Sequence, residues 1–344
     1  MKIPTLKTQY SKINNLLYLS YIPKVINAAI DIELFEILSK GSFTLETIIK
    51  KLGTSKRVTE ALLNVLIAIN LITKEKGKYI HTGVSEEYLV QKSEANQLHD
   101  IKRFSGSMGP FDNLLAALKG EKPNFDNSMW SSKEAVLNME QGAKAGAIQN
   151  VVSFVKIIPE FSSCTNMCDF AGSIGYYSYA LLQENPKLES HVYDLPVVCK
   201  MAREIKQNEK NFNRVAYHDF DISKDKSFGG GYDLFFSSHF LYEFGANRSL
   251  VDFLKKVNQS MKQGGIFISN HICDKALNNE DSLTLSLVEL QTRAMGYPTH
   301  QLPEVTLKKA LKETGFGEFT VKQPNGIYAF PTLLLSAKKM HETS

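Results

Sequence analysis

Two aspartates, Asp169 and Asp194, each end a short apolar run and are the residues with the clearest chemical potential. A turn of small residues, Ala171-Gly172-Ser173-Ile174-Gly175, follows the first run, and a helix-like segment at 176–184 follows the turn. Small residues let the backbone approach a ligand closely, and a new helix directs its free N–H groups at that ligand. An acid that closes the second strand suits the two hydroxyl donors of a ribose. The pattern predicts a strand–turn–helix–strand unit that binds a nucleotide-like cofactor; a tight turn that binds nothing is the alternative.

The acids, the turn and the tripeptide Asp194-Leu195-Pro196 together carry a more specific resemblance. The unit resembles motif I and the acidic loop of S-adenosylmethionine-dependent methyltransferases, in particular the small-molecule O-methyltransferases of the plant caffeate and animal hydroxyindole type. That family usually has D-x-G-G-G-x-G in the turn, where this chain has Ala171 and Ser173 at the first and third turn glycines. The resemblance implies S-adenosyl-L-methionine as the cofactor, with Asp169 placed to accept from its cationic amino group.

The resemblance extends the expected cofactor site to further strand ends. His218-Asp219-Phe220 stands where the family has G-D-F or G-D-M, which implies that Asp219 accepts from the adenine amino group and Phe220 packs on the ring. A solvated loop acid is the alternative for Asp219. The residues expected to bind the cofactor are Asp169, Gly172, Asp194, Asp219, Phe220 and Ser238.

The acid–base positions depart from the family pattern. Tyr242, Glu243 and Phe244 stand where the family usually has H-D-W, whose histidine is the general base. A neutral tyrosine is a poor base near pH 7, whereas a histidine titrates there. His239 lies three residues before Tyr242, and His271 replaces a family glutamate at the end of the fifth strand. We therefore expect His271 or His239 to handle the proton and Tyr242 to place the acceptor, although a lone histidine is more often structural.

Methyl transfer needs little acid–base help, because the sulfonium is already activated and alignment does most of the work. The altered motif therefore leaves three options open: an acidic acceptor, a carbon nucleophile, or histidines acting from new places. Carbon-methylating relatives that act on bacteriochlorophyll precursors are similar in having Leu-Tyr here. The expected reaction is O- or C-methylation of a small aromatic or conjugated acceptor; a fold that binds the cofactor but no longer methylates is the alternative.

Bulk composition narrows the class of protein. The chain has 344 residues, 43% hydrophobic and 22% charged, which predicts a globular protein of two domains. A net charge of +4 and the absence of a long apolar run give no case for nucleic acid or membrane partners. The four cysteines lack the spacing of a metal site, so no metal is expected. The polar N-terminus lacks a signal-peptide pattern, and we expect a cytoplasmic protein.

The N-terminal hundred residues read as helices followed by a hairpin. Apolar periodicity predicts helices within 12–40, at 45–52 after Thr44, and at 56–70 after Ser55, and a turn at Lys76-Gly77 predicts a hairpin. This is a winged-helix order, for which DNA binding and dimerisation are the alternatives. No basic cluster surrounds the third helix, and the resemblance implies a dimerisation domain. We therefore expect a winged-helix-like domain at 1–100 and a homodimer.

Residues 101–344 should form the methyltransferase domain. Helices and loops are expected up to residue 150, with large apolar side chains that could roof a substrate pocket or simply pack as core. Those side chains are Met108, Phe111, Met129, Trp130, Met139 and Phe154. From residue 165 strand and helix patterns alternate, and Gln323-Pro324-Asn325-Gly326 joins two final strands without a helix. This predicts an α/β fold: a Rossmann-like, doubly wound sheet of class I methyltransferase type with a C-terminal antiparallel hairpin.

Two further function classes fit parts of the pattern. A dinucleotide oxidoreductase would share the glycine-containing turn, but the closing hairpin and the N-terminal helical domain disfavour it. A DNA-binding regulator would share the winged-helix order, but the low net charge disfavours that class.

Overall fold

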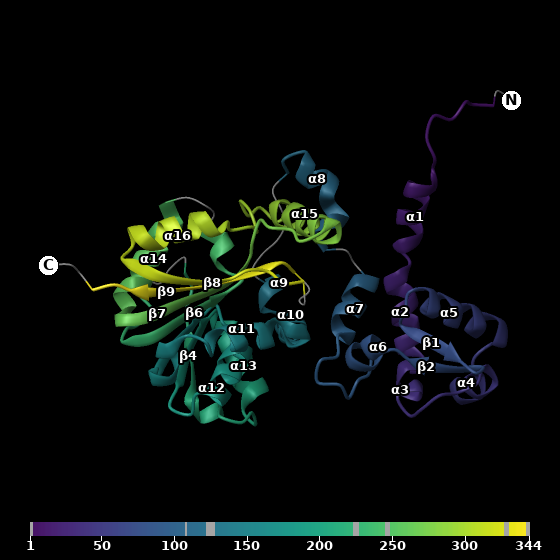
Figure 1. Cartoon of the computed structure of the whole chain (residues 1–344), viewed down its shortest axis with the longest axis horizontal. Coiled ribbons are helices and arrows are strands. Elements are labelled where there is room, and N and C mark those ends of the chain that lie inside the picture. The colour runs from purple at the N-terminus through teal and green to yellow at the C-terminus, as the bar shows by residue number, and fades with distance from the viewer. Residues whose placement is uncertain are drawn as a thin grey trace. The chain divides into compact units, whose positions relative to one another are not determined.

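The computed structural model describes residues 3–106, 109–121, 128–222, 227–244, 248–326 and 330–341. Two compact units make up the chain, Met1–Gly109 and Pro110–Ser344, and each is described by itself (Figure 1). None of the helices in these ranges has the length and apolar character needed to cross a bilayer.

The first unit consists of helices and one hairpin. Its elements are α1 (Ser11–Leu19), α2 (Ile22–Asp31), α3 (Leu34–Leu38), α4 (Leu45–Leu52), α5 (Lys56–Ala68), β1 (Ile72–Glu75), β2 (Lys78–His81), α6 (Gly83–Tyr88) and α7 (Leu98–Ser105). The stretch predicted as helical at 12–40 is three helices. Pro23 lies in the first turn of α2, where its fixed φ starts a helix, and Glu33 takes a φ of 60° between α2 and α3.

Local turn chemistry in this unit mostly follows the sequence. Thr44 Oγ1 accepts from the Thr47 N–H at 3.3 Å, and Gly53 ends α4 with a φ of 65°. The hairpin turn Lys76-Gly77 has φ values of 47° and 80°, as a two-residue turn between antiparallel strands requires. Ser55 stands at the N-cap of α5, where the sequence predicts the helix to begin, but its side chain makes no capping hydrogen bond.

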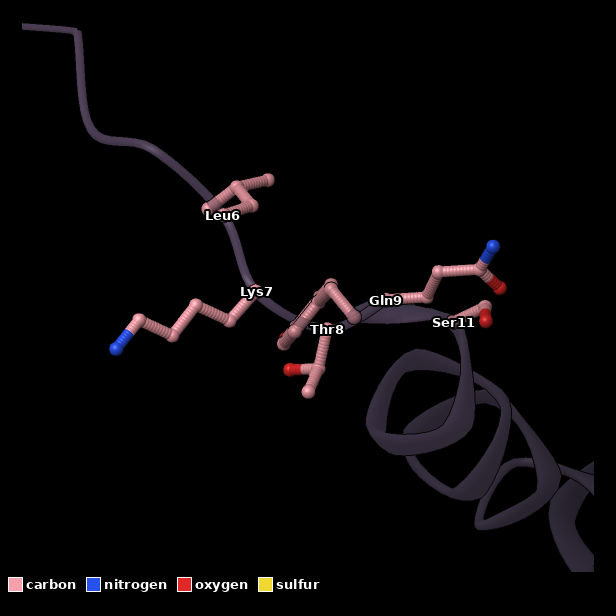
Figure 2. A pocket seen from close by; sticks show the side chains of 6 residues that line it. Leu6, Lys7, Thr8, Gln9 and Ser11 are labelled. Carbon is pink, nitrogen blue, oxygen red and sulfur yellow. The ribbon is translucent and has the colours of Figure 1, made fainter.

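Helix α1 is unusual because none of its residues is buried within its own unit. Large apolar side chains nevertheless cover it, with Leu16 64% and Tyr18 66% exposed. The segment that leads into α1 is also exposed, and Figure 2 shows Leu6, Lys7 and Thr8 projecting from a single stretch of chain. The shallow hollow at residues 6–11 is lined by this segment alone, so it cannot enclose a ligand and is not a candidate site.

The second unit is built around a seven-stranded sheet. Its strands are β3 (Asn166–Phe170), β4 (Glu189–Asp194), β5 (Val215–Asp219), β6 (Tyr232–Ser238), β7 (Met261–Ile272), β8 (Phe316–Lys322) and β9 (Thr332–Lys339). Its α-helices are α8 (Leu114–Leu118), α9 (Ser128–Ser131), α10 (Lys133–Gly142), α11 (Ile148–Val155), α12 (Tyr176–Glu184), α13 (Pro196–Lys206), α14 (Arg248–Ser260), α15 (Asn279–Ala294) and α16 (Glu304–Glu313).

The strand order is β5-β4-β3-β6-β7-β9-β8, with β9 antiparallel to both of its neighbours and the other strands parallel. The predicted doubly wound sheet and its closing hairpin are therefore confirmed. Chain order reverses between β3 and β6, which makes the carboxyl ends of these strands the topological switch point where ligands of open α/β sheets bind.

Side chains alternate between two buried faces of the sheet. Ile266 and Ile268 of β7 belong to the core beneath α11 to α13, whereas Phe267 belongs to the core with α14 and α16. Phe154, one of the predicted roof residues, is 1% exposed in the first core. Met108 lies outside the described residues, as does the side chain of Met129.

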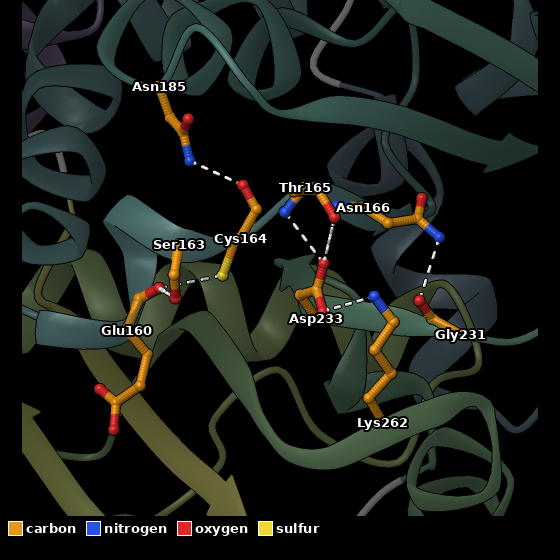
Figure 3. Close-up of polar contacts among 9 residues, drawn as sticks. All are labelled: Glu160, Ser163, Cys164, Thr165, Asn166, Asn185, Gly231, Asp233 and Lys262. Carbon is orange, nitrogen blue, oxygen red and sulfur yellow. Dashed lines mark hydrogen bonds and ion pairs between the residues drawn. The ribbon is translucent and has the colours of Figure 1, made fainter.

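Asp233 ties together the amino-terminal ends of three neighbouring strands (Figure 3). Its Oδ2 accepts from the Thr165 N–H, the Thr165 hydroxyl and the Asn166 N–H at 2.8–3.0 Å, and its Oδ1 accepts from Lys262 Nζ at 2.7 Å. Burial raises the pKa of Asp233, but the hydrogen bonds from Lys262 and Thr165 outweigh it and leave the pKa below its ordinary value. Asp233 is therefore a stabilising, fully partnered carboxylate.

We expect Asp233→Ala to lower the free energy of unfolding by about 2–3 kcal/mol, because two backbone donors lose a charged acceptor. Lys262→Ala should cost under about 1 kcal/mol, since that lysine is half exposed and its pair is screened. Because the folded-state pKa is depressed, the Asp233 contribution is present above about pH 4, the unfolded value, and is lost below it. Urea unfolding at pH 7 and pH 3 checks both points; equal effects of the two substitutions would contradict them.

Candidate functional site

The turn between β3 and α12 holds its backbone in a conformation that favours glycine. Ala171, Ser173 and Gly175 have φ values of 54°, 53° and 81°. A Cβ on Gly172 would lie 2.6–2.8 Å from the carboxyl atoms of Asp169, so only glycine fits there. Ala171 and Ser173, which stand where the family has glycine, are thus strained positions. The Ser173 hydroxyl is also buried without a hydrogen-bond partner among the described residues.

Asp169 is 1% exposed at the end of β3. Its Oδ2 accepts from the Ser178 hydroxyl of α12 at 2.5 Å, and Ser178 in turn lies 2.8 Å from the Ser190 hydroxyl of β4. Burial raises the pKa of Asp169 to about 7, the Ser178 hydrogen bond opposes that shift, and the nearby charge of Asp194 adds to it. A cation placed beside Asp169 would therefore lower its pKa and favour the ionised carboxylate near neutral pH.

Asp194 ends β4 and is held by backbone donors from both sides. Its Oδ2 accepts from the Ser173 N–H and its Oδ1 from the Leu195 N–H, each at 2.8 Å. Burial nevertheless raises the pKa of Asp194 to about 6. Asp194 thus holds the turn after β3 through the Ser173 N–H. The spacing of Asp169 and Asp194 along the sequence places both at this turn.

Glu243 is a third acid at this point and was not among the predicted cofactor residues. It lies in the 3-10 turn Leu241–Phe244 after β6. Burial first, and then the charge of Asp194, raise the pKa of Glu243 to about 7. Within the described ranges, no lysine or arginine pairs with Asp169, Asp194 or Glu243. Glu243 thus acts electrostatically on the half-buried Asp194, which in turn acts on the buried Asp169, and the described residues supply no counter-ion to any of the three.

Asp219 and Phe220 lie beside Asp194, as the strand register places them. Asp219 pairs with Asp194 across β4 and β5, and the Phe220 N–H donates to the Asp194 carbonyl at 2.8 Å. Asp219 is exposed and lies 3.5 Å from an Arg203 guanidinium nitrogen. Phe220 is 7% exposed and packs edge-on against Phe170. Their predicted contacts with adenine stay predictions.

A polar cluster closes the site at the ends of β6 and β7. The Asn270 amide nitrogen lies 3.0 Å from Ser238 Oγ, 3.3 Å from the Tyr177 hydroxyl and 3.5 Å from His239 Nε2. His239 is held there because its backbone N–H donates to the Asn270 carbonyl at 2.8 Å and its φ is 51°. Ser238 therefore lies beside Asn270 at the ends of β6 and β7, and its predicted cofactor contact stays a prediction; sequence reasoning did not single out Asn270.

His239 and Tyr242 do not lie on one helix. His239 precedes the 3-10 turn Leu241–Phe244 and has a left-handed backbone. The expectation that His239 titrates near neutrality is wrong. Burial, with the charges of His300 and His271, lowers the pKa of His239 to about 3.

His271 lies away from the Asn270 cluster. Successive residues of a strand point to opposite faces, so His271 shares the face of Ser269, whose hydroxyl lies 2.8 Å from His271 Nδ1. His271 is 2% exposed, and its Nε2 has no well-formed hydrogen bond. Burial lowers the pKa of His271 to about 4, although the Leu302 backbone and Glu304 act in the opposite sense. The prediction that His271 titrates near neutrality, which was the reason for choosing it, is therefore wrong.

Tyr242 forms part of an aromatic group with residues from the far end of the chain. Its ring stacks on His300 at 4.2 Å between centroids and meets Tyr297 edge-on at 5.5 Å. Trp130 Nε1 donates to the Tyr297 hydroxyl at 3.3 Å. Sequence reasoning missed His300 and Tyr297, which no local motif marked.

The described residues contain no group of three or more His, Cys, Asp or Glu side chains arranged to hold a metal ion. All four cysteines, Cys164, Cys168, Cys199 and Cys273, are buried and free.

The strained turn yields a stability prediction. Ala171→Gly and Ser173→Gly should each raise the free energy of unfolding by about 0.5–1 kcal/mol, because relief of the positive φ exceeds the added entropy of the unfolded chain. Ser173→Gly should gain more, since it also removes a buried hydroxyl without a partner. Ala202→Gly in α13 makes the same chemical change at a buried helical position and should destabilise. The midpoints of denaturant unfolding measure these changes in stability. An Ala171→Gly variant less stable than the wild type would contradict the assignment of backbone strain.

Comparison with known proteins places this geometry in a family. The family model of the O-methyltransferase domain matches residues 123–317, and that of the O-methyltransferase dimerisation domain matches residues 14–91. Acetylserotonin O-methyltransferase of Gallus gallus is 23% identical over 328 residues, covering 89% of this chain and 92% of that protein. Bacteriochlorophyllide d C-20 methyltransferase of Chlorobaculum tepidum is 24% identical, covering 91% and 93%.

Solved structures show the same fold. The crystal structure of human N-acetylserotonin methyltransferase in complex with S-adenosylmethionine superposes with a TM-score of 0.75 at 18% identity, covering 98% of this chain and all of that one. The matched domains span most of the sheet and the site described above. The chain therefore belongs to the family of S-adenosylmethionine-dependent small-molecule O-methyltransferases.

Proposed function

We propose that this methyltransferase transfers a methyl group from S-adenosylmethionine to a small aromatic or conjugated acceptor, with the cofactor at the Asp169–Asp194 turn. The observation that carries the proposal is the buried acid group, which consists of Asp169, Asp194 and Glu243 and has no counter-ion from the described chain. A buried group of like charges is costly unless a cation joins it. S-adenosylmethionine brings a sulfonium and an ammonium.

Three further features fit this cofactor. Glycine at position 172 lets the turn pack directly against the Asp169 carboxyl, where a Cβ would clash, and so keeps that carboxyl beside the turn. The buried Ser173 hydroxyl has no partner within the described chain and can bond to a polar ligand. The N-terminal turn of α12 opens at the same point. Asp169, Gly172, Asp194, Asp219, Phe220 and Ser238 are proposed to hold the cofactor, with Asp194 on the ribose and Asp219 on the adenine amino group.

When bound, the cofactor supplies an activated methyl group on a sulfonium, and the residues of the chain align the acceptor with it. Tyr242, Tyr297 and His300 form an aromatic group on which the charge of Glu243 acts, and aromatic rings suit a planar acceptor. By their names, the two curated relatives act on acetylserotonin and bacteriochlorophyllide d, one by O-methylation and the other at a carbon. O- and C-methylation both stay within the proposal.

Tyr242 is proposed to place the acceptor. His271 and His239 were the proton acceptors proposed from the sequence. Both are buried and largely neutral at pH 7, so neither starts the reaction charged. A protein that binds the cofactor without methyl transfer is the second candidate, favoured by the buried tyrosine at the family's histidine position.

Residues 1–100 are proposed to pair two copies of the chain, and residues 101–344 to carry out methyl transfer. The exposed apolar side chains of α1 support the pairing, because an isolated helix with no buried residue has no reason to be apolar. The match to a dimerisation domain supports it from the sequence.

The acid group predicts how cofactor affinity depends on pH. Asp169, Asp194 and Glu243 have pKa values raised to about 7, 6 and 7 in the free protein, and a bound cation should lower all three. Binding therefore releases protons, so affinity for S-adenosylmethionine should rise as pH increases from 5.5 to 8 and then level off. We expect about a tenfold gain or more across that range, measured by calorimetry.

The same titration supplies its own controls. S-adenosylhomocysteine lacks the sulfonium charge and should show a shallower pH dependence. Asp194→Asn should weaken binding by about 1.5–3 kcal/mol and reduce the proton release, since it removes a charged acceptor and one titrating group. Affinity that falls with rising pH, or an unchanged affinity in Asp194→Asn, would argue against the acid group as the cofactor site.

The dimer proposal is tested on α1. Leu16→Arg combined with Leu17→Arg should shift the protein to monomer in sedimentation at micromolar concentration, because charges replace apolar contacts. Ile157→Arg changes an equally exposed apolar residue of the second unit and should leave the sedimentation coefficient unchanged. A wild-type monomer, or a double variant that remains dimeric, would remove α1 from the interface.

A further inference from the structure

His300 lies in the loop before α16, stacked on the tyrosine that replaces the family's base. The Tyr242 and His300 rings are 4.2 Å apart and only 14° from parallel. The charge of His300 also acts on His239, whose backbone is bonded to Asn270 at the end of β7. His300 is therefore part of the same group of side chains as Tyr242 and the Asn270 cluster.

Hydrogen bonding fixes which nitrogen of His300 carries the proton. The Thr292 hydroxyl donates its single hydrogen to the Val288 carbonyl at 2.8 Å. The same oxygen lies 2.9 Å from His300 Nδ1, so there it accepts, and Nδ1 must carry the hydrogen. In neutral imidazole this leaves a free lone pair on Nε2, for which the described structure shows no donor.

The loop that carries His300 is anchored to α15. Glu289 Oε2 accepts from the His300 N–H at 2.9 Å and from the Thr299 hydroxyl at 3.1 Å. Glu289 Oε1 accepts from Arg293 Nε at 2.7 Å, which holds the carboxylate in place. The imidazole is thus oriented by both its backbone and its Nδ1, in the way that a general base is usually oriented by a third group.

We infer that His300 Nε2 is the proton acceptor of this enzyme, because Thr292 holds Nδ1 and Glu289 holds the backbone while Nε2 is left to accept from an acceptor hydroxyl. The inference rests on the proposed function and assigns to His300 the role predicted for His271 or His239. His271 points to the opposite face of β7 from Asn270, and His239 Nε2 already faces the Asn270 amide.

The step balances as follows. The O–H bond of the acceptor breaks and its proton forms an N–H bond on His300 Nε2. The acceptor oxygen bonds to the methyl carbon as the C–S bond breaks. The electron pair of that bond remains on sulfur, and the product is S-adenosylhomocysteine. The imidazolium then loses its proton to water.

The surroundings of His300 set the acidity of the matching hydroxyl. Burial lowers the pKa of His300 to about 4, while Glu289 acts in the opposite sense. The titratable groups around it are Tyr242, Tyr297, His239 and Glu289. The lone pair is therefore free throughout the physiological pH range, but it is weakly basic. Such a base matches a phenol that is itself acidic better than an aliphatic alcohol.

The test uses the full-length protein, S-adenosylmethionine with a labelled methyl group, and phenols graded in acidity from phenol to 4-nitrophenol. His300→Gln should slow methylation of phenol by about 10²–10⁴-fold, the usual worth of a general base. It should slow methylation of 4-nitrophenol far less at pH 8, because that acceptor is already ionised. In His300→Gln the rate should also follow the ionisation of the acceptor with pH, whereas the wild-type rate should not.

Controls separate this role from structural damage. Calorimetry with S-adenosylhomocysteine should give wild-type affinity for His300→Gln, and His191→Gln, a half-buried histidine of β4, should leave methylation unchanged. Thr292→Val should remove the tautomer lock, seen as a changed Nδ1–H pattern in ¹⁵N histidine spectra, with a smaller loss of rate.

Three results would overturn the inference: an equal loss for every phenol, a larger loss in His271→Ala or His239→Ala, or a wild-type protein that binds S-adenosylhomocysteine but methylates no phenol. Failure of the wild type to bind S-adenosylhomocysteine would instead overturn the proposed function.

Discussion

The desolvation of three acids at the carboxyl-terminal end of the sheet, the buried Asp169 and the half-buried Asp194 and Glu243, is the constraint on which the rest of this structure depends. Their folded-state pKa values are raised above those of the unfolded chain. Between about pH 4 and 7 the folded state therefore holds more protons than the unfolded state, and folding stability falls as pH rises. Such a group costs stability unless a cation joins it, so the charge of the proposed cofactor explains the arrangement better than the shape of the turn alone.

The two ends of the same sheet use aspartate in opposite ways. At the amino-terminal ends of the strands, Asp233 has four donors and a depressed pKa, so it stabilises the strands that it joins. At the carboxyl-terminal ends, Asp169 has one side-chain donor and a raised pKa. The strained residues Ala171 and Ser173 lie at this second end as well. Unsatisfied charge and backbone strain thus collect where the ligand is proposed to bind, as is general for functional sites.

The parts of this fold that depend on local chemistry could be predicted from the sequence. The bounds of α4 and α12 match the predicted 45–52 and 176–184, because a capping threonine and glycines mark their ends. Asp194 was placed correctly beside the turn because strand length and turn length fix that distance. Helix α15 was missed, since its apolar residues do not form a clear stripe, and with it the anchor of His300 was missed.

Burial could not be read from residue type. His239 and His271 were chosen as groups that titrate near neutrality, but desolvation keeps both neutral. Glu243 was treated as a substituted motif residue, and only the folded chain shows that it shares a region with Asp194. The contacts of His300 join residues from three separate parts of the sequence, so no local pattern could reveal them.

A carboxyl titration by ¹³C NMR, with aspartate and glutamate side chains labelled, tests the central claim most directly. Three carboxyls, assigned by Asp169→Asn, Asp194→Asn and Glu243→Gln, should titrate near pH 6–7 in the free protein. S-adenosylmethionine should move all three titrations to lower pH. If the three carboxyls are ionised well below pH 5 in the free protein, or if S-adenosylmethionine leaves their titrations unmoved, the acid group is not the cofactor site.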